Sequence, residues 1–221
     1  MTQIHNPATD TPVVRSPEEP RPKSQSNPRT IERARTLDEL ETQFTAFETQ
    51  AQALVASTGA ELCSTPPTAG SWSAAKCLQH LNISADAYFP VWQQIIANAG
   101  PRKAEMNAPY RTDLWGRLLS WILEPPPRIR SKTPNRFEPV ASETVESVLS
   151  GFLERQQRIL ATLHRCRGRA IDQVRMASPV DPRIRYSIWS SFLIVSAHER
   201  RHLWQAEQAV QRLRAGRTLS A

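Results

Sequence analysis

Two histidines near the C-terminus, His198 and His202, have the type and spacing to do chemistry. They are four positions apart in a segment with helical periodicity, so they lie about 40° apart on the helix, with Cβ atoms about 6 Å from each other. Two imidazoles one turn apart can bind the same metal ion. The rest of their arc is mostly apolar or small, which predicts that the pair faces the protein interior and needs polar partners there.

The segment from His198 to His202 also has the H-E-x-x-H spacing of zinc peptidases, in which the glutamate is the general base. Such a peptidase needs a third ligand downstream. Gln205 and Gln208 stand where the extended motif has its Gly and His, and Glu207 is too close to His202 to return to the metal. The sequence therefore argues against a zinc peptidase.

An upstream histidine can supply the third ligand instead. His80 lies on the small and apolar arc of an earlier helical segment, so it too is expected to face inward. His5 lies in an N-terminal tail and His164 lies at a helix end beside Arg165, so neither is well placed. A set of three nitrogens suits Zn²⁺, Ni²⁺ or Fe²⁺ and leaves one coordination position free, as in catalytic sites.

Other polar residues near the three histidines have more than one interpretation. Glu199 and Arg201 lie about 80° to either side of the histidine arc, where they could act as base or anion holder, orient His80, or be solvated charges. Gln205 lies on the arc and could donate to a metal-bound ligand or hydrogen-bond within the helix. Cys77, one turn before His80, is a fourth ligand or, as we prefer, a small core residue.

Apolar periodicity predicts an all-α fold with four long helices and no strands. Capping residues mark helix starts at Thr36, which forms a capping box with Glu39, at Ser73 and at Ser142. Pro90 should kink the second helix or divide it into two pieces. The expected domain is a four-helix bundle over residues 36–215, preceded by a disordered proline-rich tail at residues 1–35. Its long helices are expected at about 36–57, 73–95, 142–166 and 184–214.

The segment 101–139 is long for a loop and is expected to form a lid or cover. Within it, Asp113 to Leu123 has the pattern of a short amphipathic helix rich in Trp and Leu. This helix could lie on a membrane surface, but we favour packing on the bundle. The fourth long helix carries a second apolar stripe, which requires a second cover from the segment 101–139 or from another subunit.

Composition narrows the class of protein. With 221 residues and 39% hydrophobic content, the chain is sized for one domain, and its three cysteines lack the pattern of a disulfide framework. The net charge of +7 is spread along the chain without a nucleic-acid-binding motif. The first residues do not have the basic and apolar pattern of a signal sequence, and no apolar run reaches about 18 residues. These features predict a soluble cytoplasmic protein with no nucleic-acid or membrane partner.

Two motifs resemble those of a known family. Trp72-Ser73 preceding Gln79-His80-Leu81, followed far downstream by Ala197-His198-Glu199-Arg200-Arg201-His202-Leu203 with Gln205, resemble the DinB/YfiT-like superfamily of metalloenzymes. The resemblance covers about residues 36–214. It implies an up-down-down-up four-helix bundle, commonly a homodimer, with His80, His198 and His202 on one divalent metal. Similar members include thiol-dependent transferases and isomerases, presumed hydrolases and proteins without a known reaction.

The function expected from these residues and this resemblance is that of a metal-dependent hydrolase or thiol S-transferase. The divalent ion would lower the pKa of water or of a low-molecular-weight thiol, and the Trp-lined 110–123 segment would shape a pocket for a small-molecule substrate. The alternative is a non-catalytic metal-binding stress or interaction protein of the same fold. The sequence places no clear acid or base beside the histidines, and this absence favours the alternative.

Overall fold

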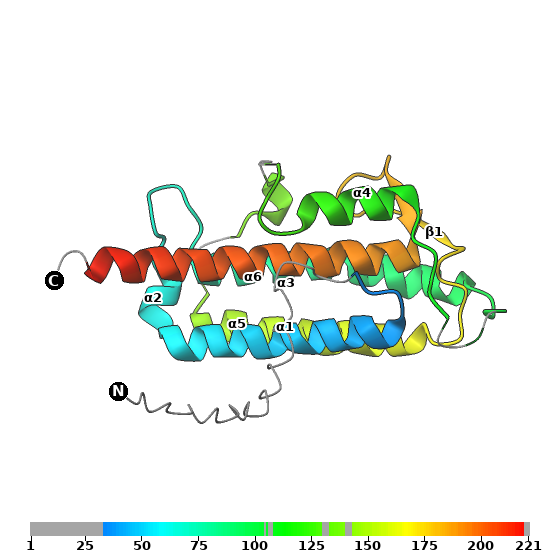
Figure 1. The fold of residues 1–221 in the computed structure, drawn as a ribbon, viewed down its shortest axis with the longest axis horizontal. Helices are drawn as coiled ribbons and strands as arrows, with labels where there is room; N and C mark the ends of the chain where they lie inside the picture. Colours follow the sequence, from blue (N-terminus) through cyan, green and yellow to red (C-terminus); the bar gives the residue numbers. More distant parts are fainter. Residues whose placement is uncertain (1–32, 104, 106–107, 130–132, 140–142, 219–221) are drawn as a thin grey trace, which may run out of the picture. The chain divides into compact units, whose positions relative to one another are not determined.

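Four long helices form the framework that positions the histidines. The computed structural model describes residues 33–103, 105, 108–129, 133–139 and 143–218. Helices α1 and α3 each contact both α5 and α6, so the four helices form a ring in the order α1, α5, α3, α6. As Figure 1 shows, α1 and α6 run in one direction and α3 and α5 in the other. This is the expected all-α bundle with up-down-down-up topology, built from α1 (Leu37–Thr58), α3 (Ala74–Ile95), α5 (Val145–Arg165) and α6 (Ile188–Thr218).

The predicted capping residues begin two of these helices. Thr36 and Glu39 form the expected capping box at α1, and the Ser73 side chain accepts a hydrogen bond from the Lys76 N–H at α3. Helix α5 is capped by Thr144, which accepts from the Ser147 N–H. The cap predicted for this helix, Ser142, lies outside the described residues.

Helix α3 continues through Pro90 to Ile95, so of the two expected effects of this proline, a kink or a division, the division is wrong. Proline removes one backbone hydrogen bond, but the residues around it are held by tertiary packing. Trp92 is fully buried, stacks on Phe192 of α6 at a centroid distance of 4.5 Å and donates from Nε1 to the Ser191 hydroxyl. This anchoring on α6 outweighs the lost backbone bond.

Several short elements have no counterpart in the sequence prediction. They are α2 (Ala60–Ser64), the 3₁₀ turns η1 (Ile96–Asn98) and η2 (Asn135–Phe137), and the strands β1 (Arg175–Ala177) and β2 (Arg185–Ser187). The two strands pair antiparallel, with Met176 opposite Tyr186. The expectation of no strands is therefore wrong for this hairpin, because three residues are too few for a period-two pattern to stand out. The pairing also delays the start of α6 from the expected Ile184 to Ile188.

A fifth helix, α4 (Leu114–Leu123), lies on the outer side of α6 and provides the second cover that α6 was expected to need. The contact is close because Gly116 and Ser120 face α6 and are buried. A Cβ added at Gly116 would lie 2.3 Å from the Ser190 Oγ atom and 2.4 Å from its Cβ atom. Asp113, the N-cap, fixes the helix by accepting hydrogen bonds from the N–H groups of Gly116 and Ser187.

The apolar face of α4 is not the face that packs on the bundle. Leu114 is 78% exposed, Trp115 and Leu118 are each 40% exposed, and Trp121 is 47% exposed. The helix packs on the bundle as expected, but through its small residues, which allow the closer approach to α6 and leave these large apolar side chains outside. Helix α4 therefore presents large apolar side chains to its surroundings.

The N-terminal boundary of the described fold lies at Arg33. Of the predicted tail at residues 1–35, residues 1–32 lie outside the described residues. Ala34 is already buried, and the Arg35 carbonyl accepts a hydrogen bond from the Tyr110 N–H at 2.9 Å. Among the helices of the described part of the chain, none combines the length and the apolar character that crossing a membrane requires.

Candidate metal centre

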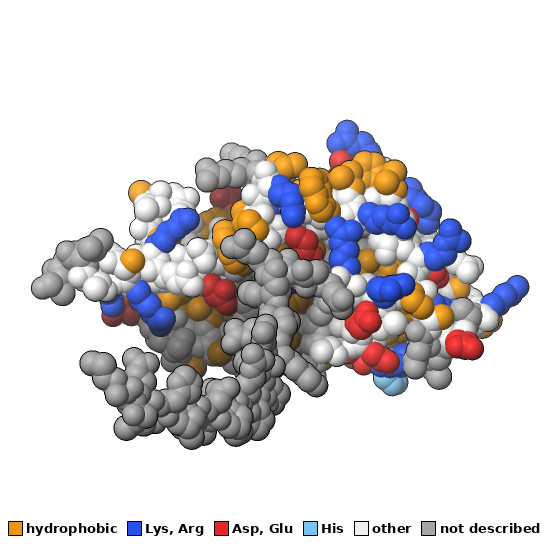
Figure 2. Space-filling model, viewed as in Figure 1, with side chains coloured by type: hydrophobic (Ala, Val, Ile, Leu, Met, Phe, Trp, Pro, Cys, Tyr) orange, Lys and Arg blue, Asp and Glu red, His pale blue; other side chains and the backbone are white. Residues whose placement is uncertain are grey.

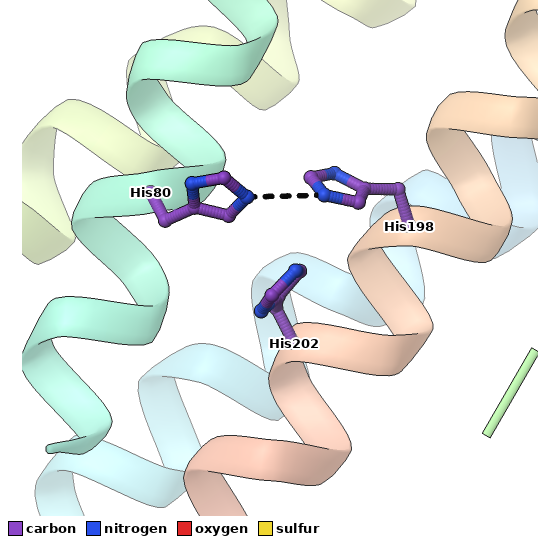
Figure 3. A group of neighbouring side chains, drawn as sticks. All are labelled: His80, His198 and His202. Carbon is purple, nitrogen blue, oxygen red and sulfur yellow. Dashed lines mark hydrogen bonds between the residues drawn. The ribbon is translucent and has the colours of Figure 1, made fainter. Parts of the chain in front are cut away.

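The three predicted histidines meet between α3 and α6 (Figure 3). His80 projects from α3, and His198 and His202 project from successive turns of α6. One ring nitrogen from each residue lies within 4.8 Å of the others. The ring centroids are 4.5 to 5.0 Å apart. The fold thus brings together side chains up to 122 positions apart in the sequence. They are the three histidines that the sequence predicts, and they form a group that could hold a metal ion.

A main-chain carbonyl sets the protonation of His80. Its Nδ1 lies 2.7 Å from the Phe137 carbonyl oxygen. A carbonyl can only accept, so Nδ1 carries the proton and Nε2 presents its lone pair. That Nε2 lies 3.1 Å from the Nε2 of His198. The neutral His198 ring can donate a hydrogen bond from its own Nε2 to this lone pair, or it can present a lone pair as well, and two lone pairs at this distance require a cation between them.

His202 contains a buried polar atom without a protein partner in the part of the chain that the structure describes. Its Nδ1 is buried and has no hydrogen-bond partner among the described residues. A buried polar atom without a partner costs about 1–3 kcal/mol, so such atoms are rare in stable folds. Two nitrogens on one tetrahedral Zn²⁺ lie about 3.3 Å apart, close to the separation of His80 and His198. The donor set therefore fits a divalent metal.

Burial keeps all three imidazoles neutral at neutral pH. Desolvation, followed by the neighbouring His80 and Arg201, lowers the pKa of His198 to about 3. Desolvation, followed by the neighbouring His198 and His80, holds the pKa of His202 well below its usual value. At His80 desolvation outweighs the bond to Phe137, which alone would raise the pKa. Metal ligation requires neutral imidazole, so this environment prepares the rings as ligands.

Trp72 covers part of the histidine group. Its ring stacks on His202 at a centroid distance of 5.8 Å and lies 5.0 Å from His80. The residue directly precedes the Ser73 cap, so the start of α3 fixes its position. An indole at this place restricts the access of water to two of the three rings.

The chain after α4 crosses the histidine-bearing part of α6. Glu124 forms an ion pair with Arg200 at 2.6 Å, in which both side chains are 12% exposed. Arg201 donates to the Ile129 carbonyl at 3.0 Å, and Phe137 reaches His80. The segment 101–139 thus contacts both helices that carry the histidines.

The other candidate residues are placed unequally. Glu199 is buried and points to α5, where its carboxyl accepts from the Gln156 amide at 3.0 Å. Burial raises the pKa of Glu199 to about 8. The Phe137 carbonyl, rather than Glu199, orients His80. Gln205 hydrogen-bonds His202, and Arg201 is close enough to lower the pKa values of His198 and His202.

The remaining cysteine and histidine candidates lie apart from the group. Cys77 packs in an apolar cluster with Val145 and Ala206, and burial raises its pKa to about 12, so it stays a thiol. His164 is exposed in the last turn of α5, and His5 lies outside the described residues.

Sequence reasoning missed Phe137, because a main-chain carbonyl has no residue signature. The available signal is local: Pro134 precedes the turn η2, which ends at Phe137 and presents its backbone to α3.

Comparison with known proteins agrees with the resemblance of the motifs. No curated protein and no solved structure matches the chain significantly. The sequence model of the DinB superfamily matches residues 43–206, a span that begins in α1, ends in α6 and includes all three histidines. This match covers well over half of the chain. The chain therefore belongs to the DinB superfamily.

Proposed function

We propose that His80, His198 and His202 bind one divalent ion, Zn²⁺, Ni²⁺ or Fe²⁺, at the centre of a hydrolase or thiol S-transferase site. The observation that carries the proposal is the convergence of one ring nitrogen from each histidine within 4.8 Å, with the His80 and His198 Nε2 atoms 3.1 Å apart. Three neutral protein nitrogens leave a position for a small-molecule ligand.

The chain contributes orientation, exclusion of water and positive charge. Phe137 holds His80 with Nδ1 protonated, so that Nε2 faces the other rings. Trp72 shields His80 and His202, and Arg201 places a cation beside the histidines that favours an anionic substrate or nucleophile. When bound, the divalent ion supplies Lewis acidity, which makes water or a thiol a nucleophile near neutral pH.

Glu199 is proposed as a positioning residue of the bundle, because its carboxyl is hydrogen-bonded to Gln156 on α5. The nucleophile then comes from outside the chain, as water or as a low-molecular-weight thiol. The position of Gln205 against His202 supports a role in orienting that ring.

Metal content and reactivity of matched variants test the proposal. His198→Ala removes one ligand, and His164→Ala removes an exposed histidine as a control. We expect about one equivalent of metal in the wild type and His164→Ala, and less than about a tenth of that in His198→Ala. Metal-dependent turnover in a panel of thiols with an electrophile, or of activated esters in water, distinguishes the transferase from the hydrolase.

Two results would count against this function. Equal metal content in His198→Ala and the wild type would remove the proposed site. Stoichiometric metal without turnover in either panel, combined with loss of the fold in His198→Ala, would support the non-catalytic alternative in which the metal ties the bundle together.

A further inference from the structure

The outer face of α4 carries an unusual concentration of large apolar side chains. At 100° per residue, Leu114, Leu118 and Trp121 fall within about 60° of one another, directly opposite the buried Gly116 and Ser120. Figure 2 shows hydrophobic side chains in orange over α4, with blue Lys and Arg side chains among and around them. No acidic residue occurs in α4. The helix is thus apolar on its exposed side and lacks any negative charge.

A basic cavity adjoins the N-terminal end of this face. It has a volume of about 450 Å³, and its lining includes Arg33, Arg35, Arg111 and Arg117 but no acidic residue. In the part of the chain that the structure describes, no hydrogen bond or ion pair engages the guanidinium of any of the four. Two carboxylates lie next to the arginines, since Glu39 accepts from the Arg35 N–H and Asp172 accepts from the Arg111 N–H. The four guanidinium groups outnumber them, and clustered guanidinium groups attract phosphate or another multivalent anion.

The apolar face and the basic cavity are continuous. Arg117 lines the cavity and lies on the same helix, one position before Leu118 and about 60° from Leu114. Arg111 immediately precedes the helix. At the other end Arg128 stacks on Trp121 at 4.7 Å and donates to its carbonyl. The surface therefore combines Trp and Leu at its centre with arginines at both ends.

We propose that this face of α4 docks the protein on the surface of an anionic phospholipid bilayer. The lipid phosphates bind the four cavity arginines, and Leu114, Leu118 and Trp121 enter the boundary between headgroups and acyl chains. A helix with an apolar face, aromatic residues and arginine flanks has the chemistry of this interface. This proposal departs from the sequence-based expectation of no membrane partner.

Charge argues against a second copy of the chain as the occupant. A two-fold interface places the same patch on both partners, so the α4 face and its arginines would meet their own copies. Such an arrangement brings like charges together at the edge of the contact. An anionic surface pairs the same arginines with phosphate. The proposal is independent of the metal centre.

Sedimentation of the full-length protein with vesicles tests the docking. Phosphatidylcholine vesicles are compared with vesicles in which one third of the lipid is phosphatidylglycerol. We expect binding to the anionic vesicles only, weakened by added salt. The double variants Arg111→Ser/Arg117→Ser and Leu118→Ser/Trp121→Ser should each weaken binding about tenfold or more. Arg212→Ser and Val180→Ser, at exposed positions outside this face, should bind as the wild type, and circular dichroism checks the fold of each variant.

Three results would overturn the proposal. The first is equal binding, or none, to the two kinds of vesicle. The second is conversion of a dimer to a monomer by Leu118→Ser/Trp121→Ser, which shows that a second copy covers the face. The third is binding of inorganic phosphate that depends on Arg111 and Arg117 while Leu118→Ser/Trp121→Ser leaves vesicle binding unchanged, which identifies a site for a soluble anion.

Discussion

The Nδ1 of His80 donates to the main-chain carbonyl of Phe137 across 57 positions of sequence, at 2.7 Å. The Phe137 side chain is 5% exposed, and the Arg136 guanidinium lies 5.0 Å over its ring. Arg136 also donates to the carbonyls of Pro179 and Val180. A buried ring and a neighbouring arginine therefore hold the carbonyl that orients a histidine of the candidate metal centre.

Phe137→Ala should weaken metal binding while retaining all three histidines. Loss of the buried ring loosens the turn η2, so that His80 loses its fixed orientation, and outer-shell changes of this kind cost about 10–100-fold in metal affinity. Competition with a chromophoric chelator measures the affinity. Phe44→Ala, a buried phenylalanine of α1, is the control: it should lower the unfolding free energy by about 3–5 kcal/mol without changing metal affinity. Wild-type affinity in Phe137→Ala would mean that the carbonyl does not control the site.

His202→Leu should separate metal binding from the stability of the apoprotein. The Nδ1 of His202 is buried and unpartnered among the described residues, so an apolar side chain of similar size removes a polar atom that costs about 1–3 kcal/mol. We expect the metal-free variant to be at least as stable as the metal-free wild type in urea, and added Zn²⁺ to raise the melting temperature of the wild type alone. A large loss of stability in the metal-free variant would instead indicate a structural role for the imidazole.

Gly116→Ala should detach α4 from α6. Alanine is favoured over glycine in a helix by about 1 kcal/mol, but its Cβ would lie 2.3 Å from the Ser190 Oγ atom. The steric term dominates, and we expect a loss of about 1–3 kcal/mol in unfolding free energy. Gly216→Ala in α6 is the matched control, since a Cβ there meets nothing within 4 Å, and it should be neutral or stabilising. If Gly116→Ala were stabilised as well as Gly216→Ala, α4 would be free to shift away from Ser190.

The sequence allowed the histidine group and the bundle to be predicted, because both depend on long-range periodicity. Helical spacing places His198 and His202 on one arc, and the inward arc of His80 makes a meeting in the bundle the natural outcome. Capping at Thr36 and Ser73 depends on local hydrogen bonds that the sequence shows directly.

Other features depend on contacts that a linear pattern does not contain. The sequence predicts helix α4 at the right residues and on the bundle, but its pattern does not show that the close approach of Gly116 to Ser190 outweighs the burial of Trp and Leu. Pro90 stays inside α3 because Trp92 anchors the following turn. The carbonyl of Phe137 has no residue signature of its own, and Pro134 marks only the turn that presents it.

Glu199→Gln should abolish a pH dependence of stability. Burial raises the pKa of Glu199 from 4.5 to about 8, so between pH 7 and 8 the folded protein keeps a proton that the unfolded chain has released. The unfolding free energy therefore falls as pH rises, by about 1 kcal/mol over this interval. In Glu199→Gln the amide can pair with both atoms of the Gln156 amide, including the Oε1 that lacks a partner among the described residues. We expect urea unfolding to show this decline between pH 7 and pH 8 in the wild type and in Glu207→Gln, a control on the same helix. Glu199→Gln should lack the decline. The same decline in Glu199→Gln would assign the lost proton to another group.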